Sequence, residues 1–389
     1  MGVATLPAAA GFTAPQLPDA GALRTPALVI DFDRVERNIT ATLDLLNGDA
    51  DRWRPHLKTA KLALTMRRLM ARGVTRAKCA TALELETACR AGFTDVVFAY
   101  PAHGPHVAAV RRIAGEHPGA AISALVEDEG MVEPWRGGPV SLFIDLNSGM
   151  DRTGMPVDRH DDVLALARTI RGAGLRFAGL HMYDGHAYGM AAGEREGMIR
   201  AGYDRLSALV ERLRSAGVEV PEVITAGTPA FPHAAGYSRL QEAGVVHRLS
   251  PGTVVYNDAK SLEQLPRDAG YGPAVFVLSR VVSHPLATRF TCDAGHKSVS
   301  ADAGVPTCAV AGHPEYTPRQ PSEEHLPMDV PAGTPLPPRG ELLWLVPMHV
   351  CPTVNNFDHA VIVSGGAIQG VERVTARGRH EPLEQAKTP

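Results

Sequence analysis

Short runs of apolar or β-branched residues alternate with longer amphipathic stretches through the middle of the chain. Each short run ends at polar residues or glycine, as buried strands do. Strands are predicted at 54–59, 77–81, 95–100, 120–126, 141–146, 177–183, 222–227 and 246–252. Helices are predicted at 60–72, 82–92, 161–172 and 194–217, the last with apolar residues at close to a 3.6-residue period.

Eight strands alternating with helices favour a (β/α)8 barrel of the TIM type over an open, doubly wound sheet. The chemically interesting residues support this fold, because they lie at or just beyond the predicted carboxyl ends of strands. These residues are Lys58, Arg152, Tyr183, Gly227 and Gly252. Active sites of such barrels form at that rim.

The pattern changes from about residue 271 onward. Strands are predicted at 275–284, 289–293, 341–346 and 359–364, with proline-rich connections and no convincing helix. The proline-rich segment 315–339 is predicted to be a loop, and the early strand 27–31 is a candidate partner for these later strands. We therefore predict a barrel domain at 34–266 and a smaller β-rich domain from residues 1–33 and 267–389.

The bulk composition is that of an ordinary globular protein. Among 389 residues, 44% are hydrophobic and 21% are charged, and the formal net charge is −3. No basic footprint indicates nucleic acid, no apolar run reaches membrane-spanning length, and the N-terminus lacks a secretory signal. Five cysteines without a CxxC pair indicate a reduced, cytoplasmic setting.

Lys58 is the first candidate for chemistry. A Schiff-base lysine has to be held rigidly at the mouth of a site and kept partly unprotonated. Lys58 ends a predicted strand, and Arg54 and His56 share its face at two-residue spacing. Nearby cations lower the pKa of a lysine, which would help. The alternative is an ordinary strand start that ends in a solvated lysine.

Two glycine-threonine turns follow the last two predicted barrel strands. Gly227-Thr228 and Gly252-Thr253 offer backbone N–H groups and hydroxyls to a phosphate dianion, at the usual barrel phosphate position. Such turns are common, and Arg152 alone could be an exposed turn residue. A lysine, a phosphate cradle and an arginine able to donate to a phenolic oxygen together suggest a pyridoxal phosphate enzyme.

His349 and Cys351 form a second signal. On a strand, two-residue spacing would put the imidazole and the sulfur on one face, ready to bind one cation. A thiolate with an imidazole favours zinc over magnesium or calcium, and two protein ligands leave positions for water and substrate. The alternative is a buried cysteine beside a hydrogen-bonded histidine.

Two further polar clusters are candidates. Segment 181–186 closes a predicted strand, so Tyr183 could lie against a cofactor ring, and His186 could carry a proton near neutral pH. Segment 322–325, with the sequence Ser-Glu-Glu-His, is either a solvated loop face or a rim that reaches the site.

Taken together, the residues resemble the D-threonine aldolase/D-serine dehydratase family of fold-type III pyridoxal phosphate enzymes, over most of the chain from residue 25 to 377. The best-matching segments are 54–59, 227–229, 251–253, 293–297, 322–325 and 349–355. The resemblance implies an alanine racemase-like barrel joined to a β domain that includes the N-terminal strand. It also implies a homodimer.

The resemblance further implies a role for each matching residue. Lys58 would carry pyridoxal 5'-phosphate, Arg152 would contact its phenolic oxygen and Tyr183 would lie beside its ring. The phosphate contacts would come from Gly227, Thr228, Gly252, Thr253 and Tyr256. His349 and Cys351 would bind a divalent metal, either zinc or manganese.

Two departures from the family pattern concern the chemistry. The aldolases usually have aspartate at the second metal-ligand position, whereas this chain has Cys351, as the zinc-dependent D-serine dehydratases do. The aldolases also usually have a histidine six residues after the ring tyrosine. That position is Gly189 here, so His186 becomes the nearby candidate for proton transfer.

The resemblance predicts a lyase that acts on small D-β-hydroxy-α-amino acids, by retro-aldol cleavage to glycine and an aldehyde. The alternative is elimination from D-serine or D-3-hydroxyaspartate to a 2-oxo acid and ammonia, with Lys58 removing the α-proton. We favour the aldolase because residues 352–355 look aldolase-like. Two other classes stay open: a pyridoxal phosphate carrier without turnover, and a cofactor-free, metal-dependent barrel lyase. A racemase would need a second base, and no tyrosine occurs beyond Tyr316.

Overall fold

The computed structural model describes residues 11–382, and within them the chain divides into two compact units. We call residues 43–58, 65–252 and 378–382 the barrel unit, and residues 11–42, 59–64 and 253–377 the β unit. The chain passes from one unit to the other directly after Lys58 and directly after Gly252. The domain limits predicted from the sequence stay a prediction.

Seven parallel strands follow one another around the barrel unit, each paired with the next. They are β2 (Arg76–Cys79), β3 (Asp95–Pro101), β4 (Ala121–Val126), β5 (Ser141–Asn147), β7 (Phe177–Tyr183), β8 (Glu222–Thr225) and β9 (Val246–Leu249). The short β6 (Met155–Pro156) pairs with the end of β5.

The segment before Lys58 closes this sheet. Trp53 forms a parallel bridge with Leu249 of β9, and His56 forms one with Lys78 of β2. The segment is therefore the eighth strand position, and the predicted (β/α)8 barrel is confirmed. The prediction of a regular strand over 54–59 is wrong, because only isolated bridges occur there. Pro55 lacks the N–H that a strand ladder needs.

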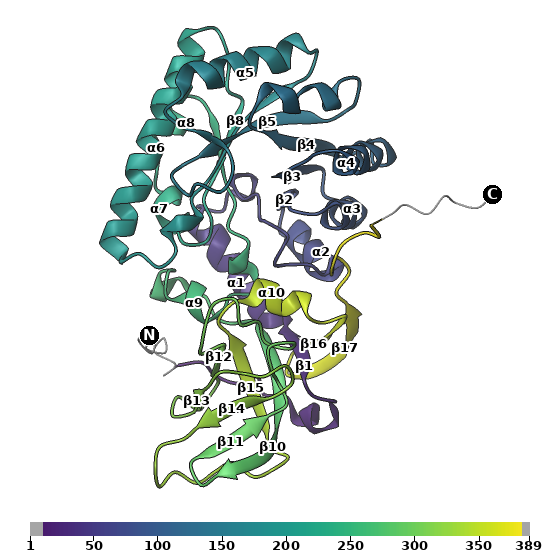
Figure 1. Cartoon of the computed structure of the whole chain (residues 1–389), viewed down its shortest axis with the longest axis vertical. Helices are drawn as coiled ribbons and strands as arrows, with labels where there is room; N and C mark the ends of the chain where they lie inside the picture. The colour runs from purple at the N-terminus through teal and green to yellow at the C-terminus, as the bar shows by residue number, and fades with distance from the viewer. Residues whose placement is uncertain (1–10, 383–389) are drawn as a thin grey trace, which may run out of the picture. The chain divides into compact units, whose positions relative to one another are not determined.

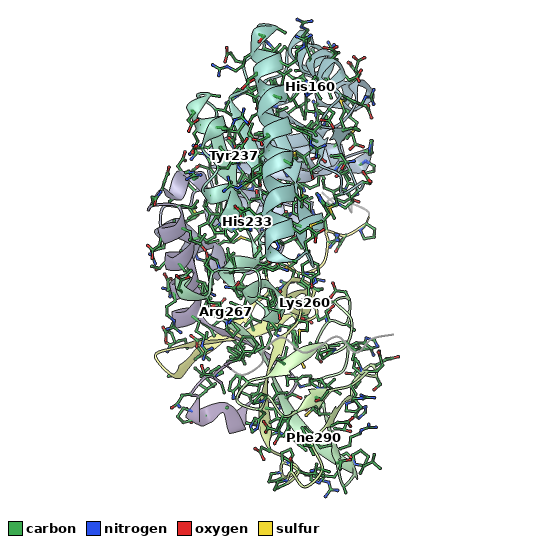
Figure 2. All side chains as sticks on the ribbon, turned by 90° about the vertical axis from the view of Figure 1, so that its left-hand side faces the viewer. His160, His233, Tyr237, Lys260, Arg267 and Phe290 are labelled. Atoms are coloured by element: carbon green, nitrogen blue, oxygen red, sulfur yellow. The ribbon has the colours of Figure 1, made fainter. Side chains whose placement is uncertain are left out.

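Helices cover the outside of the strands in the barrel unit, as Figure 1 shows for α3 to α6. The helices from α2 to α8 are α2 (Ala63–Ala71), α3 (Ala82–Ala91), α4 (Pro105–Glu116), α5 (His160–Gly172), α6 (Ala192–Ser215), α7 (Phe231–Ala235) and α8 (Arg239–Glu242). Local signals set their ends: the Thr81 side chain accepts a hydrogen bond from Glu84 N, and Gly92 ends α3 at φ 104°. Tyr237, labelled in Figure 2, lies with its hydroxyl 3.0 Å from Ser207 Oγ of α6.

Inside the barrel, apolar side chains from neighbouring strands form one cluster. It contains Val97, Leu125, Phe143, Ala178 and Ile224. The 3-10 helices of the two units are η1 (Pro18–Ala22), η2 (Ala50–Arg52), η3 (Glu129–Met131), η4 (Glu133–Trp135), η5 (Gly185–Ala187), η6 (Thr253–Val255) and η7 (Arg267–Ala269).

The β unit is built on a nine-stranded sheet in the order β13-β14-β11-β10-β1-β16-β17, with β15 paired to both β10 and β12. The strands are β1 (Ala27–Asp31), β10 (Val275–Leu286), β11 (Arg289–Cys292), β12 (Cys308–Val310), β13 (Thr317–Pro318), β14 (Leu326–Asp329), β15 (Leu342–Pro347), β16 (His359–Ser364) and β17 (Ala367–Arg373). Strand β1 lies between β10 and β16, so the predicted pairing of the early strand with the later ones is confirmed. Helix α1 (Phe32–Leu45) follows it.

Three predictions for the second half of the chain are wrong. Segment 315–339 is not only a loop, because β13 and β14 lie within it; Pro318 is tolerated on β13, which is an edge strand. Beyond residue 271, where no helix is predicted, the unit contains the helix α10 (Val350–Asn355); the short helix α9 (Ala259–Leu262) precedes that point. The segment at Cys351 is thus helical rather than extended. Pro352 lies in the first turn of α10, where a missing N–H is harmless.

All five cysteines lie within residues 11–382, all are buried, and no disulfide joins them. In the same range, no helix combines the length and apolarity needed to cross a bilayer.

Candidate active site

The five rim residues of the barrel unit lie where the sequence placed them. Tyr183 is the last residue of β7, Gly227 is two residues beyond β8 and Gly252 is three beyond β9. Lys58 follows the His56 bridge by two residues, and Arg152 follows β5 by five. Because the strands are parallel, all five belong to the carboxyl-terminal rim of the barrel.

The ring of Tyr183 is the centre of a cationic cluster. Its centroid lies 5.9 Å from Lys58 Nζ, 5.7 Å from Lys78 Nζ and 4.8 Å from Arg152 Cζ. These are distances at which a cation is attracted to the face of an aromatic ring. The structure therefore brings together the predicted Lys58, Arg152 and Tyr183, and adds Lys78.

The Tyr183 ring packs closely against the backbone of Gly185 and Gly227, and the buried Asp184 carboxylate binds the turn after β8. A Cβ on Gly185 would lie 2.2 Å from the Tyr183 ring, and one on Gly227 would lie 2.9 Å from it. Asp184 accepts hydrogen bonds from Gly227 N at 2.8 Å and from Tyr203 Oη at 2.7 Å. Burial raises the pKa of Asp184. The Gly227 N–H is therefore bound to Asp184 in this structure, and the contact of Gly227 with a phosphate stays a prediction.

Other polar atoms in the two glycine turns of the barrel unit have the properties of a phosphate site. Ser250 Oγ is buried and has no hydrogen-bond partner within residues 11–382. Thr228 is buried, and Gly252 lies so close to the preceding segment that a Cβ on it would come within 2.3 Å of His56 O. Ala226, before the first turn, has a left-handed φ of 62°. These residues fit the phosphate of the expected cofactor.

Sequence reasoning missed a chain of three buried side chains inside the barrel. Lys78 Nζ lies 3.1 Å from His181 Nε2, and His181 Nδ1 lies 2.7 Å from Asp145 Oδ1. Burial, and then the charge of Lys58, lower the pKa of Lys78 to about 7. Burial also lowers the pKa of His181. The available signal was one lysine flanked by Ala77 and Cys79 within a predicted strand.

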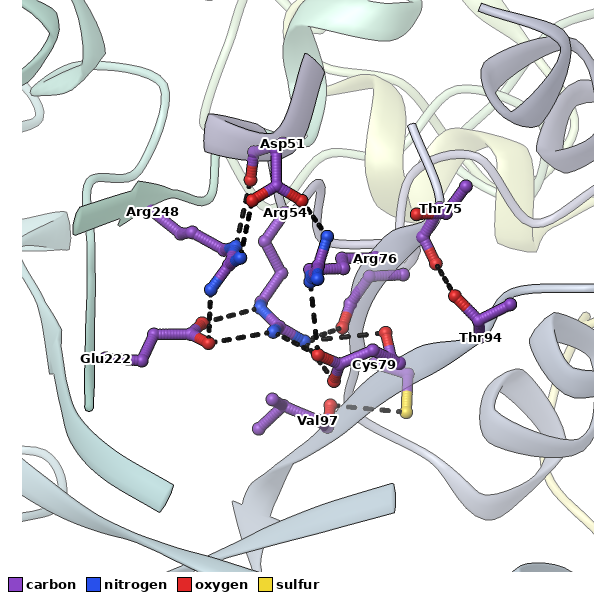
Figure 3. A network of polar contacts seen from close by, with 11 residues as sticks. Asp51, Arg54, Thr75, Arg76, Cys79, Thr94, Val97, Glu222 and Arg248 are labelled. Carbon is purple, nitrogen blue, oxygen red and sulfur yellow. Dashed lines mark hydrogen bonds and ion pairs between the residues drawn. The ribbon is translucent and has the colours of Figure 1, made fainter. Parts of the chain in front are cut away.

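Arg54 does not act beside Lys58, contrary to our expectation. Its side chain is fully buried and makes paired hydrogen bonds to Asp95 at 2.8 Å each, with further bonds to Glu222 at 3.0 and 3.2 Å. Asp95 and Glu222 begin β3 and β8, so Arg54 lies at the opposite, amino-terminal end of the barrel (Figure 3).

The predicted metal ligands lie at the start of α10 in the β unit. His349 is the N-cap residue, and Cys351, in the first turn, is 8% exposed. His349 Nδ1 lies 2.6 Å from Asp302 Oδ2. Burial alone would lower the pKa of His349, but hydrogen bonds with Cys351 and Asp302 raise it to about 9. The two predicted ligands are therefore neighbours, although a helix start and not a strand brings them together.

Contacts within the β unit fix this helix start. Asp258 Oδ2 accepts a hydrogen bond from Val350 N at 2.9 Å. Thr59 Oγ1 lies 2.9 Å from Cys351 Sγ, and Thr253 Oγ1 lies 3.7 Å from it. Asp302 and Asp258 were not singled out from the sequence.

The donor set fits a metal ion with an open coordination sphere. Residues 11–382 contain no group of three or more His, Cys, Asp or Glu side chains arranged to hold a metal. A thiolate and an imidazole are nevertheless ordinary zinc ligands, and Asp302 occupies the position behind the histidine where a carboxylate orients it. The pair would leave the remaining positions to water and substrate.

The remaining candidates are spread over both units. His186 lies in η5 of the barrel unit, half-buried, and its Nδ1 has no hydrogen-bond partner within residues 11–382. Tyr256 is fully buried in the β unit, where its carbonyl accepts a hydrogen bond from Ala274 N. Glu323 and Glu324 are exposed and both pair with Lys297 Nζ, which matches the solvated-loop alternative for segment 322–325.

Two family models match the chain. Residues 30–259, more than half of the chain, match the model for the N-terminal domain of alanine racemase. The chain belongs to this family. Residues 274–363 match the model for a putative serine dehydratase domain, so this alanine racemase-like protein is of the D-threonine aldolase/D-serine dehydratase kind. The resemblance seen in the sequence is confirmed.

Named relatives are similar over nearly the whole length of this alanine racemase-like chain. It is 29% identical to a D-threonine aldolase of Arthrobacter sp., over 91% of this chain and 93% of the relative. It is 26% identical to the D-threo-3-hydroxyaspartate dehydratase of Delftia sp. HT23, over 90% and 97%. The crystal structure of D-threonine aldolase from Filomicrobium marinum has a TM-score of 0.84 at 29% identity, covering 94% and 99%. These relatives are lyases.

Proposed function

We propose that the protein is a lyase dependent on pyridoxal phosphate and a divalent metal, which cleaves D-β-hydroxy-α-amino acids into glycine and an aldehyde. One observation carries the proposal. Lys58 faces the Tyr183 ring in the barrel unit, and the next residue, Thr59, has its hydroxyl 2.9 Å from Cys351 Sγ in the β unit. A single peptide bond therefore links the proposed cofactor lysine to a residue that contacts the proposed metal ligand.

Residues of the barrel unit would hold the cofactor. Membership of the family implies pyridoxal 5'-phosphate, which supplies an electron sink for breaking a bond at the α-carbon. Lys58 would bind its aldehyde carbon, Arg152 would neutralise its phenolic oxygen, and Tyr183 would support its ring. Thr228 and Gly252 offer a hydroxyl and a backbone N–H to the phosphate.

The other predicted phosphate contacts are Gly227, Thr253 and Tyr256. Gly227 would contribute close approach of the backbone and not its N–H, because that group donates to Asp184. Thr253 and Tyr256 stay predictions, as the roles of all these residues do. Ser250 joins the set, because its buried hydroxyl lacks a partner within residues 11–382.

His349 and Cys351 would hold the metal ion. An imidazole and a thiolate favour zinc, and manganese is the alternative suggested by the family. A metal at this point supplies a Lewis acid for the β-hydroxyl group of the substrate. Asp302 would keep the His349 ring turned so that Nε2 is the ligand atom, because its carboxylate engages Nδ1.

Dehydration is the second candidate function. Cys351 favours it, because the zinc-dependent D-serine dehydratases have cysteine at this position, and a dehydratase is among the named relatives. Lys58 would then remove the α-proton, whereas retro-aldol cleavage needs a base at the hydroxyl group, for which His186 is the predicted carrier. A homodimer and a cytoplasmic location also stay predictions.

Product analysis distinguishes the two functions. With D-threonine, we expect glycine and acetaldehyde; with D-serine, we expect little reaction. Formation of 2-oxobutyrate from D-threonine, or pyruvate from D-serine, would establish the dehydratase instead. Chromatography of products from the metal-supplemented protein, with L-threonine as the matched control, makes the measurement. No product from either D-amino acid would overturn the proposed function.

The metal assignment gives a prediction about Asp302. Asp302→Asn keeps the shape of the side chain but removes the negative charge beside His349 Nδ1, so the affinity for the metal should fall by roughly 10- to 100-fold. His349→Ala and Cys351→Ala should lose bound metal and most turnover but keep the visible band of the cofactor. Competition titration with a chromophoric chelator measures the affinity.

Glu315→Gln is the matched control for Asp302→Asn. Glu315 Oε1 lies 3.0 Å from His313 Nδ1 in the same unit, so it forms the same kind of carboxylate–histidine pair away from the proposed ligands. The metal affinity of Glu315→Gln should equal that of the wild type. Equal affinities for Asp302→Asn and the wild type would show that Asp302 does not orient a metal ligand.

A further inference from the structure

Three charged or polar side chains point into the barrel where apolar residues would be expected. Lys78 comes from β2, Asp145 from β5 and His181 from β7, and all three are buried, with exposed fractions of 3%, 3% and 4%. Buried lysines are rare because desolvation of the ammonium group is costly, so the site must compensate for the cost or use the neutral form.

The hydrogen bonds among Lys78, His181 and Asp145 fix which atoms donate a proton and which accept one. A carboxylate only accepts, so Asp145 Oδ1 requires the proton of His181 on Nδ1. The other ring nitrogen, Nε2, then presents a lone pair to Lys78 Nζ at 3.1 Å. Lys78 therefore donates to His181, and Asp145 fixes the tautomer that makes this possible.

Charged groups surround Lys78 in the barrel unit. Lys58 and Arg152 act on it as cations, and Asp145 and Asp184 as anions. Burial contributes most to lowering the pKa of Lys78 to about 7; the charges of Lys58 and Arg152 also lower it, and those of Asp184 and Asp145 oppose the change. Near neutral pH the Lys78 amine is thus present in both protonation states. The ring of Tyr183 faces both Lys78 and Lys58, at 5.7 and 5.9 Å.

We propose that Lys78 is a proton-transfer residue of this enzyme, which takes a proton from Lys58 Nζ and returns it, with His181 and Asp145 as its positioning residues. A lysine ammonium has to lose a proton before its amine can act as a nucleophile or base. In the transfer Lys58 loses one proton and Lys78 gains one, and no bond between heavy atoms changes. The inference rests on the proposed function, since it assigns a partner to the same Lys58.

The first test follows the amine itself rather than turnover. The full-length holoenzyme is labelled with 13Cε-lysine and titrated from pH 5.5 to 10 by NMR. One lysine resonance should titrate well below the ordinary lysine value, should be missing from Lys78→Met, and should persist in Lys61→Met. Lys61 is a suitable control because it is also buried, but donates to Ala376 O in the β unit. A Lys78 resonance that titrates near pH 10 would overturn the inference.

The second test uses the pH profile of kcat. Lys78 accepts a proton only when neutral, so activity should rise with pH through the value at which the Lys78 resonance titrates. Lys78→Met should keep the visible band, lose roughly 100-fold or more in kcat, and lack this rise. Lys78→Arg keeps a cation but cannot give up its proton, so it should be as impaired as Lys78→Met. Full activity of Lys78→Arg would mean that only the charge matters, and would refute proton transfer.

His181→Gln provides a variant that leaves Lys78 in place. It should move the Lys78 resonance and the rise in kcat to the same new pH, whereas a structural role would lower activity at every pH equally. Borohydride reduction attaches the cofactor permanently to its lysine, and peptide mapping then identifies that lysine. This result distinguishes a failure of the inference from a failure of the proposed function. Label on Lys58 without the Lys78 titration refutes the inference alone, whereas label on Lys78 refutes the inference and the assignment of Lys58. A colourless protein refutes the proposed function, while the NMR titration still tests Lys78.

Discussion

Lys58→Ala should abolish both the visible absorption band of the cofactor and lyase turnover, with a loss of at least about a thousandfold in kcat. Lys58 is the predicted covalent anchor, and it lies at the carboxyl-terminal rim of the barrel, over the Tyr183 ring. Alanine removes the amine and changes little else, because Lys58 is only half-buried at a loop position after the His56 bridge. Absorption spectroscopy of the purified variant and product analysis with D-threonine measure the two effects.

Lys61→Ala is the matched control, because it removes a lysine three residues away whose ammonium group donates to the backbone carbonyl of Ala376 in the β unit. Lys61→Ala should keep the normal visible absorption band of the cofactor. A normal band in Lys58→Ala would refute the cofactor assignment. Turnover without any band, in the wild type as in the variant, would instead favour the cofactor-free metal lyase. A band without products would favour a carrier.

The barrel and its rim could be predicted because their signals are local in sequence. Strand β7 (Phe177–Tyr183) and strand β16 (His359–Ser364) match the predicted limits, since both are short apolar runs bounded by polar or glycine residues. Parallel strands also collect the residues after their carboxyl ends on one rim, so Lys58, Tyr183 and Gly227 could be grouped without knowledge of any contact.

The buried polar partners could not be predicted because they are distant in sequence. Lys78 and His181 are 103 residues apart, and Asp145 and His181 are 36 apart. Asp302 and His349 are 47 apart. No periodicity links such pairs, and a single lysine or aspartate within a strand has many possible partners until the barrel closes.

The pairing of His349 with Cys351 was predicted correctly for an incorrect reason. Spacing of two residues brings side chains to one face only in an extended strand, and Cys351 lies in α10. Contacts specified elsewhere, such as Asp258 Oδ2 accepting from Val350 N, stabilise the helix start instead.

The amino-terminal end of the barrel contains the network that should matter most for stability. Three arginines alternate with three carboxylates there, as Figure 3 shows for Asp51, Arg54, Arg76, Glu222 and Arg248, with Asp95 as the sixth member. Arg54 is the central cation and is fully buried, and it bonds to both Asp95 and Glu222. The charges balance, so removal of Arg54 leaves the network with one negative charge in excess and takes away the only fully buried cation among the three arginines.

Arg54→Met should therefore lower the free energy of unfolding by about 3–5 kcal/mol at neutral pH. Urea denaturation monitored by tryptophan fluorescence measures the change. The surface pair of Arg212 and Asp161 is the control, because Arg212→Met removes an exposed ion pair of 2.8 Å in the same unit and should cost less than about 1 kcal/mol. A cost for Arg54→Met as small as for Arg212→Met would show that the network is not stabilising.

The dependence of this loss on pH follows from Asp95. Burial alone would raise the pKa of Asp95, but its hydrogen bonds to Arg54, with the charges of Arg54, Arg76 and Arg248, lower it below the ordinary value. The stabilisation is therefore present above the unfolded-state pKa of about 4 and is lost as the pH falls through the lower folded-state value. The difference in the free energy of unfolding between the wild type and Arg54→Met should be largest at pH 7 and should become smaller below pH 4. Because Arg54 and Lys58 lie at opposite ends of the barrel, the folded fraction of Arg54→Met should keep the visible band that Lys58→Ala loses.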